Sequence, residues 1–168
     1  MTVTPVSGVI SENTTWTKYG SPYNLTGHLI IDEFASLTIE PGVEIKANGY
    51  RIWVNSNAKL NATGTPSEPI IFNGTGIQLR DSTENASITV KNCIITNAPY
   101  GFYVPDLGYF KNVTISFENC VFTRNGEAIS MKHLTVPFTE SSIYIVGNKI
   151  VENSGDAINI GSGGGVMF

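Results

Sequence analysis

Ile88-Thr-Val-Lys-Asn-Cys-Ile-Ile-Thr-Asn97 is the stretch that repeats most clearly along this chain. It returns as Ile115-Ser-Phe-Glu-Asn-Cys-Val-Phe-Thr-Arg124 and again as Ile143-Tyr-Ile-Val-Gly-Asn-Lys-Ile-Val-Glu152. Each copy holds two short triplets whose first and third residues share one side, which is the period-two pattern of a strand buried on one face. Because a repeat of roughly 20–50 residues is typical of solenoids, this pattern predicts the fold before any motif does.

Three lines of such triplets run along the chain together, and those of the first line recur every 23 to 29 residues. The first line is Leu29–Ile31, Ile52–Val54, Ile77–Leu79, Phe102–Val104, Ile129–Met131 and Ile158–Ile160. The second line is Leu37–Ile39, Leu60–Ala62, Ile88–Val90, Ile115–Phe117 and Ile143–Ile145. The third line is Val43–Ile45, Ile70–Phe72, Cys93–Ile95, Cys120–Phe122 and Asn148–Ile150.

Turn-forming residues separate the triplets, as at Glu40-Pro41-Gly42, Asn73-Gly74 and Asn125-Gly126. A hairpin meander could use similar turns, but it would not keep three lines in register over five or six repeats. Stacking each rung on the last, with parallel strands about 4.8 Å apart, keeps that register and buries every inward residue. We therefore expect an all-β parallel solenoid of about six rungs, with three short strands per rung.

The opening of the chain resembles a known family. The residues that carry the resemblance are Asn13-Thr-Thr-Trp16, Gly20-Ser-Pro-Tyr23, Leu37-Thr-Ile-Glu-Pro-Gly-Val-Glu-Ile45, Leu60-Asn-Ala-Thr-Gly-Thr65 and Pro69-Ile-Ile-Phe72. They look like the start of right-handed parallel β-helix modules on archaeal and bacterial cell-surface proteins, within the pectin-lyase-like fold. The resemblance implies a right-handed, single-stranded β-helix, and this architecture carries lyases, hydrolases, adhesins and spacers alike.

The repeat divides the chain simply. We expect one domain over residues 1–168, with an N-terminal cap and partial first rung in 1–25 and repeating rungs in 26–160. Residues 161–168 are glycine-rich and read as a tail or an incomplete last rung. Their apolar end, Val166-Met-Phe168, has no evident polar cap, so joining of rods end to end into a homo-oligomer or filament is an expectation.

Composition excludes several kinds of partner and favours a location. The 168 residues carry a net charge of −4 and no basic run, which argues against nucleic acid. No apolar stretch approaches the roughly 18 residues of a transmembrane helix, and residues 1–5 lack the features of a signal peptide. Few lysines and abundant Ser, Thr and Asn suit an extracellular or cell-surface protein.

Six Asn-X-Ser/Thr sequons support that location as candidate N-glycosylation sites. Chance matches are common in a chain rich in Asn and Thr, so unused sequons are the alternative. The six are Asn13, Asn24, Asn61, Asn73, Asn85 and Asn112.

Two cysteines, Cys93 and Cys120, occupy the same inward position in successive rungs, and Asn148 continues their line. Adjacent parallel strands hold side chains side by side rather than in the torsion of a disulfide. We expect two buried free thiols, with a disulfide as the alternative.

Carbohydrate-active members of the fold that this chain resembles act on the outer face of one sheet, so the resemblance implies that a glycan would bind on the outer face of the first line. Trp53 and Tyr103 point outward there and offer flat faces for a sugar, although ordinary exposed strand aromatics would look the same. His28 and Arg51 precede triplets of this line, and Arg80 follows one.

Glu127 and Asp156 are the residues that catalysis would require, because they align in Gly126-Glu-Ala-Ile and Gly155-Asp-Ala-Ile. We expect them about 5 Å apart at the backbone, on adjacent rungs. A carboxylate pair suits glycoside hydrolysis, and Ca²⁺ binding is a further alternative, although one pair supplies few oxygen ligands. An ordinary polar turn explains them equally, and we expect no catalytic residues, no metal and no cofactor.

Resemblance to the glycan-cleaving enzymes of this fold is incomplete. Gly155-Asp-Ala-Ile-Asn-Ile-Gly-Ser-Gly163 is similar to the polygalacturonase signature, but Gly155 stands where the first aspartate would be, and the companion motifs are missing. A lyase would need a basic residue, for which only Arg80 or Lys132 is available. We therefore expect a non-enzymatic structural or adhesive module, such as a part of a surface layer or filament, with a polysaccharide lyase or glycoside hydrolase as the alternative.

Overall fold

The chain folds into parallel β-strands that stack in three lines. The computed structural model describes residues 3–105, 108–131 and 138–160. The first line is β3 (Tyr23–Ile31), β6 (Ile52–Val54), β9 (Ile77–Leu79), β13 (Tyr100–Tyr103), β17 (Glu127–Met131) and β21 (Ile158–Ile160). The second is β2 (Thr14–Trp16), β4 (Ser36–Ile39), β7 (Lys59–Thr63), β11 (Ser87–Lys91), β15 (Thr114–Glu118) and β19 (Ser142–Val146). The third is β5 (Glu44–Lys46), β8 (Ile70–Asn73), β12 (Cys93–Thr96), β16 (Val121–Thr123) and β20 (Lys149–Val151).

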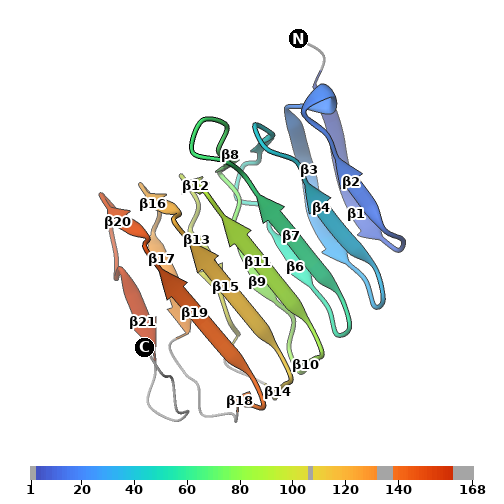
Figure 1. Ribbon diagram of the computed structural model, residues 1–168, viewed down its shortest axis with the longest axis vertical. Helices are drawn as coiled ribbons and strands as arrows, with labels where there is room; N and C mark the ends of the chain where they lie inside the picture. Colours follow the sequence, from blue (N-terminus) through green and yellow to red (C-terminus); the bar gives the residue numbers. More distant parts are fainter. Residues whose placement is uncertain (1–2, 106–107, 132–137, 161–168) are drawn as a thin grey trace.

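The predicted all-β parallel β-helix is confirmed. Figure 1 shows the rungs stacked along one direction, with β2 at one end of the stack and β20 and β21 at the other. The predicted register of the first line of strands is also confirmed, because Ile30 pairs with Trp53, Trp53 with Gln78, and Gln78 with Tyr103. The expected tail at 161–168 and the candidate base Lys132 lie outside the described residues.

The first rung departs from the simple repeat. β1 (Thr4–Ile10) runs parallel to β3, and β3 is long enough to pair with β5 through Tyr23 and with β6 through Leu29. One continuous strand therefore serves both the third and the first line at this end. The remaining elements are short: β10 (Thr83–Glu84), β14 (Phe110–Lys111), β18 (Phe138–Thr139) and the 3₁₀ turn η1 (Lys18–Gly20).

The core is the column of inward side chains. Its largest fully buried members are phenylalanines, and Phe117 lies with its ring centroid 5.1 Å from that of Phe102 and 5.4 Å from that of Phe122. Burial of each such ring contributes about 1.5–3 kcal/mol, so the stack is a major source of stability.

One turn position repeats between the second and third lines. Asn92, Asn119 and Gly147 all have positive φ there, at 50°, 53° and 66°. Asparagine and glycine are the residues that adopt this left-handed conformation at least cost. A Cβ on Gly147 would also lie 2.4 Å from Oδ1 of Asn119, so that side chain would have to move to admit a larger residue.

Asn125 is a buried polar residue that joins successive rungs. Its side chain is 1% exposed; Oδ1 accepts a hydrogen bond from the Ala98 N–H at 3.0 Å, and Nδ2 donates to the Ile95 carbonyl at 3.0 Å. Asn153 repeats the role one rung later, because its Nδ2 donates to the Phe122 carbonyl at 3.1 Å. Asn125 thus satisfies the Ala98 N–H just after β12 and also binds a carbonyl within β12, and the Asn153 amide binds a carbonyl within β16.

Candidate functional site

Trp53, Gln78 and Tyr103 lie side by side on the outer face of the first line. Trp53 and Gln78 are the middle residues of β6 and β9, Tyr103 ends β13, and the strand register sets each beside the next. Each is half-buried, while its neighbours in the triplet point inward and are buried. The two predicted glycan-contact residues therefore share one face, two rungs or about 10 Å apart at the backbone.

Trp53 is packed between two other side chains. The ring of His28 stacks on it, with centroids 4.6 Å apart and planes at 14°, and the guanidinium carbon of Arg80 lies 4.7 Å from its centroid. Because β3 and β9 flank β6 on opposite sides, His28 and Arg80 cover opposite faces of the indole. Both flat faces of Trp53 are therefore covered, its Nε1 is buried as well, and the rest of the ring edge is what this arrangement leaves for a ligand.

Arg51 is held by a second aromatic group. Its Nη1 donates a hydrogen bond to Oε1 of Gln78 at 2.6 Å, and its guanidinium carbon lies 5.1 Å from the Tyr100 centroid and 5.5 Å from that of Tyr103. The two tyrosine rings are themselves 5.0 Å apart. A guanidinium stacked on rings in this way keeps N–H groups at its edge for an anion.

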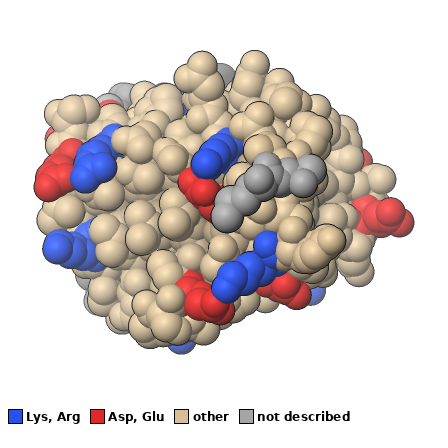
Figure 2. Space-filling view, turned by 90° about the horizontal axis from the view of Figure 1, so that it is seen from above, with Lys and Arg blue, Asp and Glu red and all other residues tan. Residues whose placement is uncertain are grey.

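Arg51 and Arg80 have no carboxylate partner among the described residues, unlike several other basic side chains. The ion pairs in this part of the chain are Lys18–Glu68, Lys46–Glu44, Lys91–Glu118 and Arg124–Glu152. Charge is otherwise sparse, and the face in Figure 2 shows a largely uncharged surface with scattered acidic and basic groups. Two fixed, unpaired arginines on one face are suited to carboxylate or sulfate groups.

The structure places Glu127 and Asp156 on adjacent rungs, as predicted. The Ala128 N–H donates to the Asp156 carbonyl oxygen at 3.2 Å, which sets the two carboxylate-bearing residues at neighbouring backbone positions. Oδ2 of Asp156 accepts a hydrogen bond from Nδ2 of Asn159 at 2.7 Å in an exposed position, whereas Glu127 is half-buried. Within the described ranges, no three His, Cys, Asp or Glu residues gather as metal ligands would.

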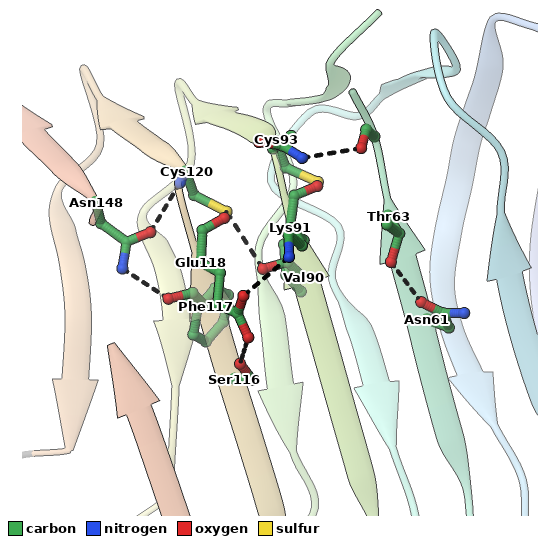
Figure 3. Close-up of polar contacts among 12 residues, drawn as sticks. Asn61, Thr63, Val90, Lys91, Cys93, Ser116, Phe117, Glu118, Cys120 and Asn148 are labelled. Carbon is green, nitrogen blue, oxygen red and sulfur yellow. Dashed lines mark hydrogen bonds and ion pairs between the residues drawn. The ribbon is translucent and has the colours of Figure 1, made fainter. Parts of the chain in front are cut away.

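Cys93 and Cys120 are free and buried, and they lie side by side in β12 and just before β16 (Figure 3). Sγ of Cys93 donates to the Ala62 carbonyl at 3.3 Å, and Sγ of Cys120 donates to the Val90 carbonyl at 3.4 Å. Interaction with the Cys120 thiol, and then burial, raise the pKa of Cys93. Each thiol also lies near a carbonyl of its own rung, Lys91 at 3.2 Å from Cys93 and Glu118 at 3.3 Å from Cys120, so its single proton is shared between its own rung and the rung before it.

Asn148 completes this line of donors. Its Nδ2 donates to the Phe117 carbonyl at 2.7 Å, and its Oδ1 accepts from the Cys120 N–H at 2.8 Å (Figure 3). The three carbonyl groups that accept these bonds all belong to the third residue of a second-line triplet. Thiol and amide therefore make the same contact at one repeat position.

The sequons differ in exposure. Asn13, Asn61, Asn85 and Asn112 are exposed, whereas Asn24 and Asn73 are half-buried. The six candidate glycosylation sites therefore differ in how accessible they are to a transferase.

Sequence reasoning missed some of the residues on the outer face. Tyr100 and Tyr50 were not singled out, although Tyr100 lies under Arg51 and Tyr50 packs edge-on against His28 with centroids 5.6 Å apart. Both lie just before first-line triplets, where His28 and Arg51 were already recognised. A comparison of the residues just before each first-line triplet would have found both tyrosines.

Comparison with known proteins gives a similarity at the level of a family model. Residues 8–84 match a family model described as a pectate-lyase like beta helix domain. No curated protein and no solved structure matches the chain significantly. No helix in the described ranges is long and apolar enough to cross a bilayer. The match covers 77 of the 168 residues, so it shows a similarity to this family over the first half of the chain, and the parallel solenoid described above is consistent with it.

Proposed function

We propose that this protein is an extracellular, non-enzymatic β-helix module that binds acidic glycans on the outer face of its first line of strands. The single observation that carries the proposal is the pair of arginines, Arg51 and Arg80, which are stacked on aromatic rings without a described carboxylate partner. Both come from first-line rungs, so a ligand lying across the strands can meet both.

Acidic sugars fit this surface better than neutral ones. A guanidinium recognises a carboxylate or sulfate through two parallel N–H bonds, and stacking on a ring removes much of the side-chain freedom that binding would otherwise cost. The Gln78 amide, which holds Arg51 at 2.6 Å, fixes that side chain further. Pre-organisation of this kind raises affinity without adding contacts.

Binding without cleavage is supported by the arrangement around the carboxylates. Asp156 is exposed and hydrogen-bonded to Asn159, and the sequence lacks the companion motifs of the hydrolases it resembles. The lyase or hydrolase alternative stays a prediction with its own test below.

Tryptophan fluorescence offers a direct test of binding. The chain has two tryptophans; Trp16 is 4% exposed and stacked on Tyr23, so Trp53 is the one that a ligand on the outer face would perturb. We expect oligouronates to change the emission and neutral oligosaccharides of equal length to bind far more weakly. Affinity should fall as salt rises, because the contacts are ionic.

Single variants locate the site. Arg51→Gln or Arg80→Gln should each weaken oligouronate binding about tenfold or more, since hydrogen bonds to charged groups contribute about 1.5–3 kcal/mol. Arg124→Gln is the matched control, because Arg124 is exposed and pairs with Glu152 at 3.4 Å. Equal affinity in all three variants, or equal binding of neutral sugars, would refute the proposal.

Assembly through rod ends is a second part of this proposal. The inward residues of the last described rung, Ile143, Ile145 and Ile150, are only partly buried, whereas Ile115 and Phe117 one rung earlier are fully buried, so this end presents apolar surface of the kind that another molecule covers. Light scattering on the natural protein tests this: concentration-dependent growth of linear assemblies supports it, and a strict monomer argues against it.

A further inference from the structure

The six sequons differ in the exposure of their residues and in the hydrogen bonds of their asparagine side chains. Asn61 and Thr63 lie two residues apart on β7, so both point outward and both are exposed, while Ala62 between them is buried. Oγ1 of Thr63 donates to Oδ1 of Asn61 at 2.8 Å (Figure 3). No described residue hydrogen-bonds to Nδ2 of Asn61, so the atom that would take a sugar is accessible.

Asn13 has the same accessibility. It is exposed just before β2, and the hydroxyl-bearing residue of its sequon, Thr15, is exposed as well. The Ser36 hydroxyl donates to Oδ1 of Asn13 at 2.8 Å, which leaves Nδ2 without a partner in the described part of the chain.

Asn73 and Asn24 lack this accessibility. The Thr75 hydroxyl that completes the Asn73 sequon belongs to a fully buried residue. Asn24 is half-buried inside β3, with Pro5 of β1 on one side and Lys46 of β5 on the other.

Asn85 and Asn112 are exposed, but their amide nitrogens are already engaged. Nδ2 of Asn112 donates to Oδ1 of Asn85 at 2.8 Å, and Nδ2 of Asn85 donates to Oδ1 of Asn57 at 3.2 Å. This ladder joins three successive rungs at turn residues of positive φ, 57°, 52° and 52° from Asn57 to Asn112. A sugar on either nitrogen would lie against the side chain of the adjacent rung.

We propose that the folded protein is N-glycosylated at Asn61 and Asn13 and at none of the other four sequons. In the reaction, Nδ2 of the asparagine forms a bond to the anomeric carbon of a lipid-phosphate-linked oligosaccharide. The bond from that carbon to the phosphate oxygen breaks, the lipid phosphate leaves with its electron pair, and the amide proton passes to a base on the transferase. No oxidant or reductant is involved.

Placement of the two sites gives the proposal a structural consequence. Asn61 is a residue of β7, and Asn13 adjoins β2, so both glycans would stand on the second line of strands. The stacked arginines belong to the first line. Glycans at these positions would therefore coat one side of the rod and leave the other side open.

Glycosylation of the folded full chain by an oligosaccharyltransferase, with a lipid-linked oligosaccharide as donor, is the test. Glycopeptide mass spectrometry should find the sugar at Asn61 and Asn13 only. A second reaction on the urea-unfolded chain should extend modification to Asn73 and to the ladder asparagines, because their protection comes from the fold.

Matched variants separate acceptor chemistry from misfolding. Thr63→Ala should abolish modification at Asn61 and leave Asn13 unchanged, whereas Thr38→Ala, which removes the hydroxyl paired beside Asn61 on β4, should change neither. Unchanged circular dichroism checks the fold of both variants. Sugar on Asn73, Asn85 or Asn112 of the folded chain, or none on Asn61, overturns the proposal; neither result bears on glycan binding at the arginines.

Discussion

Replacing Asn125 with alanine should destabilise the protein more than any exposed asparagine would. The change removes the acceptor of the Ala98 N–H and the donor to the Ile95 carbonyl, both at 3.0 Å and both in the interior. Leaving a buried polar group unpaired costs about 1–3 kcal/mol, so two such groups predict a loss of about 2–6 kcal/mol. That is a large share of the roughly 5–15 kcal/mol by which a typical domain is stable.

Urea unfolding followed by circular dichroism measures this loss. The midpoint should fall while the slope with denaturant stays constant, because the surface exposed on unfolding barely changes. Asn48→Ala is the control: Asn48 is exposed in a turn, and its side chain has no hydrogen bond among the described residues, so the change should stay within about 0.5 kcal/mol.

Asn125→Asp sharpens the same prediction. The carboxylate keeps an acceptor for the Ala98 N–H but sets a negative oxygen against the Ile95 carbonyl in a buried site. The loss should exceed that of the alanine variant at neutral pH and shrink as the pH falls and the carboxyl group takes up a proton. An alanine variant as stable as the wild type, or an aspartate variant indifferent to pH, would contradict the role assigned to this amide.

Three further predictions concern titratable groups. Cys93 and Cys120 are both buried, and the neighbouring Cys120 thiol and burial raise the pKa of Cys93, so both thiols should react with a chromogenic thiol reagent only at the rate of unfolding; prompt native labelling would argue otherwise. The hydrogen bond from Lys91 lowers the pKa of Glu118, so its contribution to stability is present above the ordinary carboxyl pKa and is lost as pH falls through the lowered one; Lys91→Met should raise that pKa in an NMR titration. The wild type and the double variant Glu127→Gln/Asp156→Asn should both depolymerise glycans no faster than buffer alone. A wild-type rate above buffer that the double variant loses would establish an enzyme instead.

The fold could be predicted from the sequence because its signal is local and repeated. Alternation in each triplet fixes which side chains point inward, and a slip of one residue would turn all of them outward. The register of Ile52-Trp53-Val54 against its counterparts in the other rungs could therefore be predicted from the alternation alone. The pairing of β1 with β3 was not predicted, since Thr4–Ile10 does not repeat the triplets that follow.

The candidate site was only partly predictable. Trp53 could be placed on the outer face from the alternation alone, and His28 and Arg80 could be placed beside triplets. That both side chains reach diagonally across rungs to cover the two faces of one indole depends on side-chain torsions that a repeat pattern does not encode. The buried role of Asn125 was hidden for a similar reason, because Asn-Gly reads as an ordinary exposed turn.

The line of Cys93, Cys120 and Asn148 has a consequence for how this rod can change length. Each residue places a donor within hydrogen-bond distance of a carbonyl of the rung before it, and both a thiol and an amide occupy this position. At this contact, each rung needs the next rung to supply a small hydrogen-bond donor at a fixed position, and the kind of side chain can vary. Rungs of the chain are therefore interchangeable units at this contact, and a duplicated copy of residues 88–114 inserted after residue 114 should extend the rod by one strand spacing, about 4.8 Å, without a new core having to be found.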